Sequence, residues 1–215
     1  MEELSMFDLI GDGVGNSDIA KIVEEKLKEK YDEDFSVVMI GNRYGAAQDS
    51  VTTYCTSKEG VVFTSILNKD QTILEDDFYL KSVTFDVEQE LNRLFKECGI
   101  SSIVKADIVG INKVDEKYSL QDFIKEYEGF NFLVYVVGDN EAIKNNIEPI
   151  YNKLAESYNG IHIKSFVYVL ENESYKSFEE YSKLLPSVNS SIIKTYNVEG
   201  EYNFKLYENK VTQII

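Results

Sequence analysis

The clearest hydrophobic pattern in the chain is an apolar stripe between Asp76 and Cys98. Its residues recur at steps of three and four, the spacing that places side chains on one face of an α-helix. Asp76 and Asp77 stand where carboxylates can accept hydrogen bonds from free N–H groups at a helix start, and Gly99 stands where helices commonly end. The pattern predicts a helix over residues 76–98 with a core-facing stripe of Leu80, Val83, Val87, Leu91, Leu94, Phe95 and Cys98.

Runs of apolar or alternating residues predict strands on both sides of this helix. The turn at 57–60 joins two of them into a hairpin, and the most apolar run, 130–137, is expected in the centre of a sheet. A final hairpin is expected about Glu199 and Gly200. The predicted strands cover residues 35–40, 50–56, 61–67, 101–109, 130–137, 161–170, 191–198 and 201–208.

Three other helical patterns occupy residues 19–31, 119–128 and 143–154. Pro149 falls inside the last of these, so a kink or a break is expected there. A capping box formed by Ser177 and Glu180 predicts that a short helix begins at Ser177 and ends before Pro186.

This order of elements predicts an α+β fold, with antiparallel or mixed sheets and amphipathic helices packed on one face. Residues 22–40 and 147–170 both read as a helix ending in Lys-Leu-x-x-x-Tyr, a polar turn and an apolar strand. This internal similarity indicates two similar α+β halves. The alternative is that two such units resemble each other by chance. The predicted organisation is a flexible lead-in at 1–15, a first half at 16–110 and a second half at 118–215, separated by the polar stretch 110–117.

The net charge of the chain bears on the expected function more than on the expected fold. The 215 residues carry a net charge of −16, which disfavours binding to the phosphate backbone of nucleic acids. Such an acidic balance keeps a protein soluble, and it also suits a partner of a basic protein. No run approaches the roughly 18 apolar residues of a membrane span, and no signal segment is visible, so the chain as it stands is expected in the cytoplasm. An extracytoplasmic location is the alternative if a signal or anchor was removed.

Residues with catalytic or ligand-binding chemistry form no recognisable set. His162 is the single histidine, on a strand face with Lys164, Phe166 and Tyr168, and neither cysteine is placed beside it by the sequence. The carboxylates of 75–77 and 32–34 stand at helix ends, where capping accounts for them without a metal. The glycines of 11–18 lack the lysine of a nucleotide loop. We therefore predict no catalytic residue, no cofactor and no metal ligand.

Aromatic residues are the more suggestive feature, with 15 tyrosines and 12 phenylalanines. Tyrosine combines a large apolar body with a polar tip and is enriched at protein interfaces. The alternative is that these rings cover the sheets in place of the absent tryptophan. The candidate partner-binding residues are tyrosines in or near polar stretches, namely Tyr44, Tyr175, Tyr181, Tyr196 and Tyr202.

One part of the chain resembles a known group of proteins. Glu29-Lys30-Tyr31 leads into Asp34-Phe35-Ser36-Val37, two strands follow, and Glu75-Asp76-Asp77-Phe78-Tyr79-Leu80 opens the long helix. Over about residues 16–98 this resembles small uncharacterised proteins of Gram-positive bacteria, many of them predicted lipoproteins or secreted proteins. The resemblance implies an extracytoplasmic setting and brings no catalytic residues.

The function that these features favour is non-enzymatic binding of a protein partner through an acidic, tyrosine-rich surface. The partner would be basic, and an immunity or inhibitor role belongs to this class. One alternative is a small-ligand protein or metal-dependent enzyme that uses carboxylate, tyrosine and lysine groups around 11–18 or 42–49. Another is a structural module of a cell-surface or mobile-element system.

Overall fold

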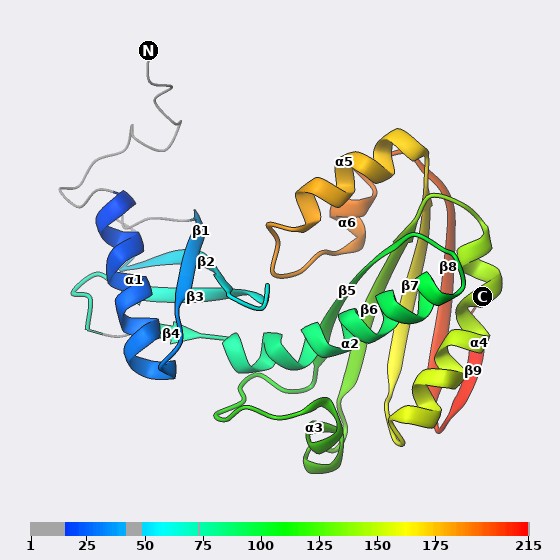
Figure 1. The fold of residues 1–215 in the computed structure, drawn as a ribbon, viewed down its shortest axis with the longest axis horizontal. Helices are drawn as coiled ribbons and strands as arrows, with labels where there is room; N and C mark the ends of the chain where they lie inside the picture. The colour runs from blue at the N-terminus through cyan, green and yellow to red at the C-terminus, as the bar shows by residue number, and fades with distance from the viewer. Residues whose placement is uncertain (1–15, 42–48, 73, 215) are drawn as a thin grey trace. The chain divides into compact units, whose positions relative to one another are not determined.

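The computed structural model describes residues 16–41, 49–72 and 74–214, and shows an α+β protein with two separate sheets (Figure 1). The chain divides into two compact units, Met1–Phe78 and Tyr79–Ile215. The segment 110–117, predicted as a boundary, lies in the second unit between a strand and a helix. The predicted lead-in at 1–15 lies outside the described residues.

The first unit packs one helix on a four-stranded antiparallel sheet. Its elements are α1 (Asn16–Tyr31), β1 (Phe35–Ile40), β2 (Ser50–Ser57), β3 (Val62–Asn68) and β4 (Leu74–Asp76), with the strands in sequence order. Alternate residues of β2 are buried, as the period of a strand with one covered face requires. Ile19, Val23 and Leu27 of α1 are buried as well, so an amphipathic helix and a half-buried sheet form this core.

Helix α2 (Phe78–Glu97) confirms the long helix expected over 76–98. Val83, Val87 and Leu91 are fully buried, as the stripe predicted. The prediction that Cys98 belongs to the core-facing stripe is wrong, because Cys98 lies just past the end of the helix and is exposed. The chain turns away there, with Gly99 in the left-handed region at φ 72°, a conformation that glycine adopts without strain.

The second unit is built on a five-stranded mixed sheet in the order β5-β6-β7-β8-β9. The parallel pair β6 and β7 is joined by the crossover helix α4, and every other pair is antiparallel. The helix continues through Pro149 without a break. The bounds are β5 (Ser102–Val109), α3 (Leu120–Glu126), β6 (Asn131–Gly138), α4 (Ala142–Ser157), β7 (Ile163–Leu170), α5 (Asn172–Ser182), α6 (Ser190–Ile193), β8 (Val198–Tyr207) and β9 (Lys210–Ile214).

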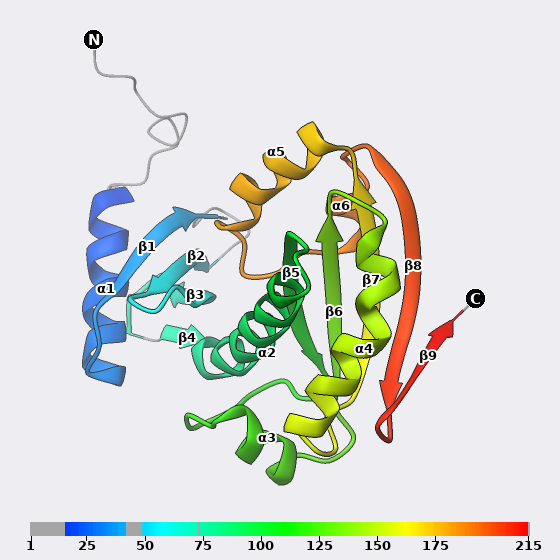
Figure 2. The ribbon, with the colours of Figure 1, turned by 45° about the vertical axis from the view of Figure 1, so that its right-hand side comes forward.

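Helices cover the two faces of this sheet unequally (Figures 1 and 2). Helices α2, α3 and α4 bury their apolar stripes in one core with Val134, Val136 and Val167 of the central strands. Helices α5 and α6 pack on the opposite face, beside Val137 and Leu170 at the ends of β6 and β7. Amphipathic helices on one face are thus as expected, and a partial second layer is added.

The C-terminal third contains the main errors of the sequence reading. Residues 190–193 form helix α6, because the Asn189 side chain accepts a hydrogen bond from the N–H of Ile192 at 3.0 Å and caps a helical turn. The predicted hairpin about Glu199 and Gly200 is wrong, since β8 runs through both residues and turns only at Glu208 and Asn209. Helix α5 begins at Asn172, so Ser177 lies inside it and donates to the Glu173 carbonyl.

Candidate functional site

The structure describes four of the five tyrosines predicted to bind a partner, and it does not bring all four together. Tyr44 lies outside the described residues. Tyr175 and Tyr181 are on α5, and Tyr196 follows α6 with its ring against Phe178, so these three belong to one helical layer. Tyr202 is on β8 and packs with the core on the opposite face, under the Lys144 ammonium group. The structure therefore brings three of the candidates together and separates Tyr202 from them.

Helix α5 presents an acidic outer surface with exposed apolar groups. Its inner side buries Tyr175, Phe178 and Ser182 against the sheet. The segment Glu171–Leu184 contains four glutamates and two lysines, and Glu173 and Glu180 are seven residues apart, two turns along one side of the helix. Tyr181 is 45% exposed and Leu184 is 49% exposed. We call Glu173, Glu180, Tyr181 and Leu184 the α5 surface.

A cavity of about 520 Å³ opens beside this helix, within the second unit. It is bounded by the last turns of α2, the start of β5 and the inner edge of α5. Burial, with Glu179 and Asp139 nearby, raises the pKa of Tyr175 to about 12, so its hydroxyl stays protonated at neutral pH. The lining can hydrogen-bond to a polar group through hydroxyls, an amide and two opposite charges: Asn92, Lys96, Gly99, Ile100, Ser101, Ser102, Tyr175 and Glu179.

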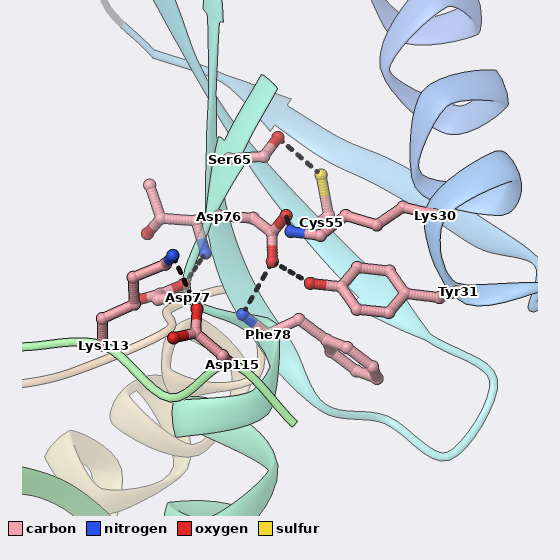
Figure 3. A network of polar contacts seen from close by, with 10 residues as sticks. Lys30, Tyr31, Cys55, Ser65, Asp76, Asp77, Phe78, Lys113 and Asp115 are labelled. Carbon is pink, nitrogen blue, oxygen red and sulfur yellow. Dashed lines mark hydrogen bonds and ion pairs between the residues drawn. The ribbon is translucent and has the colours of Figure 1, made fainter. Parts of the chain in front are cut away.

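The most concentrated polar network in the first unit surrounds Asp76 (Figure 3). The Asp76 side chain is only 1% exposed. Its carboxylate accepts hydrogen bonds from the Tyr31 hydroxyl at 2.5 Å, the Lys30 ammonium at 2.8 Å and the N–H of Phe78 at 3.2 Å. A buried carboxylate that is satisfied in this way is a structural group. It joins the end of α1 to the end of β4 and the first residue of α2, which agrees with the capping role predicted for this acidic cluster.

Cys55 lies near this network, in a buried group of small polar side chains (Figure 3). Its sulfur is 3.5 Å from the Ser65 hydroxyl, which is itself 2.6 Å from the hydroxyl of Thr53. Burial raises the pKa of the Cys55 thiol, and a protonated, enclosed thiol is a poor nucleophile. His162 lies in the other unit, where its ring contacts Tyr207 at 4.5 Å. Cys55 and His162 are thus on separate units, whereas Cys98 is in the same unit as His162.

The described part of the chain contains neither a cluster of metal-ligating side chains nor a membrane-spanning helix. Within it, no group of three or more histidine, cysteine, aspartate or glutamate side chains is arranged to hold a metal ion. None of the helices that the structure describes is both long and apolar enough to cross a membrane.

A second buried acidic group lies on α2, in the second unit. Glu88 of α2 accepts a hydrogen bond from the N–H of Ala106 at 2.8 Å, and the Lys105 ammonium is 3.5 Å away. Burial raises the pKa of Glu88, although Lys105 opposes the shift. Lys81 of α2 pairs with Asp107 in the same region. Because β5 is an edge strand, these contacts cover a strand edge that would otherwise be open to further pairing.

Comparisons with known proteins bear on the fold and not on the chemistry. No protein-family model matches the chain, and no curated protein matches it. A crystal structure of a DUF5037 family protein from Ruminococcus gnavus is similar, with a TM-score of 0.66 and 15% sequence identity. The similarity covers 90% of this chain and 94% of the other. The chain therefore shares its fold with a protein whose family has no assigned function.

Proposed function

We propose that this chain is a non-enzymatic protein that binds a basic protein partner through the α5 surface. The observation that carries the proposal is the exposure of Tyr181 on α5, and of Leu184 just past the end of this helix, together with Glu173 and Glu180. Aromatic and aliphatic side chains supply the contact area that dominates binding energy, and surrounding carboxylates select for a positive partner.

The cavity beside α5 supports the same proposal. Interfaces commonly place one anchoring side chain of the partner in a pocket near the centre of the contact. The Glu179 carboxylate and the Tyr175 hydroxyl face this cavity, and both accept hydrogen bonds from a lysine or arginine. The net charge of −16 adds long-range attraction toward a basic molecule. An immunity or inhibitor role against a basic toxin or enzyme is the form of the proposal that we favour.

Photocrosslinking in the source cell tests this proposal. A benzophenone amino acid at position 181 is expected to capture a basic protein, whereas the same group at exposed position 153 of α4 is expected to capture none. The captured protein is then purified and its affinity measured by calorimetry. Tyr181→Ala and Glu180→Lys should each weaken binding by about tenfold or more, and Glu148→Lys on α4 serves as the matched control. Equal capture at both positions, or no loss of affinity in the α5 variants, would contradict the proposal.

A small-molecule role for the cavity is the second candidate, because its mixed lining and volume also suit a compact polar ligand. Thermal-shift measurements against nucleotides, amino acids and divalent ions separate the two candidates. A ligand that raises the melting temperature of the wild type but not of Tyr175→Phe would favour this alternative over protein binding.

We also propose an origin among uncharacterised Gram-positive bacterial proteins, on the resemblance of residues 16–98. For location we propose the cytoplasm for the chain as it stands, with the cell exterior as the alternative. Fractionation of the source cell, with antibody detection of the native protein, decides between these locations. Genome neighbourhood separates an immunity role, with a toxin gene adjacent, from a module of a secretion or conjugation system.

A further inference from the structure

The face of the second unit's sheet that carries α5 and α6 has an open half with an unusual distribution of charge. Both helices lie toward the ends of β6 and β7 (Figure 2), and the opposite half carries the starts of these strands. In that half Lys164 of β7 stands directly across from Lys205 of β8, and both are exposed. Lys210 of β9 stands across from Tyr207. We call Lys164, Lys205, Lys210 and Tyr207 the lysine strip.

Two like charges at directly opposed strand positions destabilise a sheet. Among the described residues neither Lys164 nor Lys205 has a carboxylate partner. Each ammonium instead lies over a ring, Lys164 over Phe166 at 5.3 Å and Lys205 over Tyr207 at 4.7 Å from the centroid. Cation–π contacts hold the lysines in place and leave their positive charges without neutralisation.

Glu208, in the turn between Tyr207 and Lys210, is the acidic residue nearest to the strip in sequence. Acidic side chains farther along the sheet are already engaged. Asp107 of β5 pairs with Lys81, and Glu88 of α2 lies beside Lys105. In a chain with 38 acidic and 22 basic residues, a cross-strand lysine pair without an acidic partner is a local reversal of sign. Apolar groups border it, since Tyr207 is 43% exposed and Ile214 of β9 is 39% exposed.

We propose that the lysine strip is a docking site for an acidic peptide segment of a partner protein, with separate carboxylates of the peptide at Lys164 and Lys205. Each ammonium group lies over a ring two residues further along its own strand, and the two strands are antiparallel, so the groups point in opposite directions. Each can therefore contact its own carboxylate of the peptide. This surface is distinct from the α5 surface, carries the opposite charge and does not depend on the function proposed for that helix.

Two observations favour a peptide over a single-stranded nucleic acid. Base stacking needs free aromatic faces, whereas Phe166 is stacked against Tyr135 at 5.5 Å and carries Lys164, and Tyr207 contacts both His162 and Lys205. The net charge of −16 also repels a phosphate backbone of high charge density. An acidic peptide has fewer charges and offers apolar side chains to Tyr207 and Ile214.

The test uses the intact protein and a short synthetic peptide of alternating glutamate and leucine. Its glutamine counterpart and a single-stranded oligonucleotide are tested in parallel. Nuclear magnetic resonance should show shifts at Lys164 and Lys205 on addition of the glutamate peptide and none with the glutamine peptide. Lys164→Glu should weaken binding about tenfold or more, with Lys153→Glu on α4 as the matched control.

The melting temperature distinguishes a docking role of these lysines from a structural one. Lys164→Glu creates an opposite-charge pair with Lys205, so the melting temperature should rise while the affinity falls. Binding of the oligonucleotide in preference to the peptide would overturn the proposal. So would unchanged peptide affinity in both Lys164→Glu and Lys205→Glu, or an equal loss in the control variant.

Discussion

At the scale of single residues, the polar groups that matter most in this protein are buried and internally satisfied. Asp76 and Glu88 are examples, each held by hydrogen bonds and a nearby lysine. Such groups contribute little net stability when intact and cost much when one partner is lost. Their burial explains why acidic residues that were candidates for chemistry act as structural connections in the fold.

Glu88 yields a prediction about pH. Burial raises its pKa in the folded state, so the folded protein binds this proton more tightly than the unfolded chain does. The cost of the buried charge is therefore fully present above the raised pKa and is relieved as the pH falls toward the ordinary carboxyl value. Glu88→Gln should lose this dependence and keep an acceptor for Ala106, whereas Glu88→Leu should cost about 1–3 kcal/mol through the orphaned N–H.

Urea unfolding of the three proteins across the acid to neutral range measures these effects. The stability of Glu88→Gln relative to the wild type should increase with pH. A difference that stays constant over the range would show that Glu88 titrates as an ordinary carboxyl group.

At the scale of elements, helix starts are set by polar contacts as well as by apolar stripes. The N–H of Phe78 donates to Asp76, and the N–H of Thr64 donates to Asp77 at 2.7 Å, so the residues before α2 are bound to β3. Helix α6 exists because Asn189 caps it. A cap of this kind redirects the chain within one turn, which is why element boundaries depend on single side chains.

Asp76 yields a prediction at this scale. Asp76→Ala removes the acceptor for Tyr31, Lys30 and Phe78, and should destabilise the first unit by about 1–3 kcal/mol. Asp34→Ala is the matched control, because its pair with Lys28 is exposed and such pairs contribute little. Chemical denaturation followed by circular dichroism compares the two variants. Equal loss in both would mean that the buried network adds nothing beyond a surface ion pair.

At the scale of the whole molecule, two compact units of different size share one chain. The smaller unit buries proportionally less surface and should be the less stable of the two. Unfolding of such a chain need not be a single two-state transition.

Thiol labelling tests this expectation. In Cys98→Ser, the remaining Cys55 is buried in the first unit and should react only when that unit opens. With increasing urea, Cys55 labelling should become complete at a lower concentration than the loss of helical circular dichroism, to which both units contribute. Coincident transitions would show that the two units unfold together.

Local patterns were sufficient for the elements with strong periodicity. The long helix and the hairpin of β2 and β3 follow from the three-to-four spacing or alternation of their apolar residues, and the interior position of β6 follows from its continuous apolar run. Weakly periodic segments were less predictable. Residues 190–193 were expected as a strand, because one capping side chain and packing of Ile193 decide their structure.

Surface features, likewise, could be predicted only where a local sequence pattern determines them. The alternation of 161–170 already placed His162, Lys164 and Phe166 on one face. The pairing of Lys164 with Lys205 could not be predicted, because it depends on the register between β7 and β8, strands separated by two helices. The exposure of Tyr181 and the burial of Tyr175 likewise follow from which side of α5 meets the sheet.

The sequence by itself determined the fold class, the long helix and the acidic charge, because these depend on composition and on contacts between near neighbours. The tertiary structure decided which polar groups are buried, which strands are adjacent and which tyrosines remain exposed. These properties arise from contacts between residues distant in sequence. Packing of the second helical layer on the sheet, which separates the α5 surface from the lysine strip, is the clearest case.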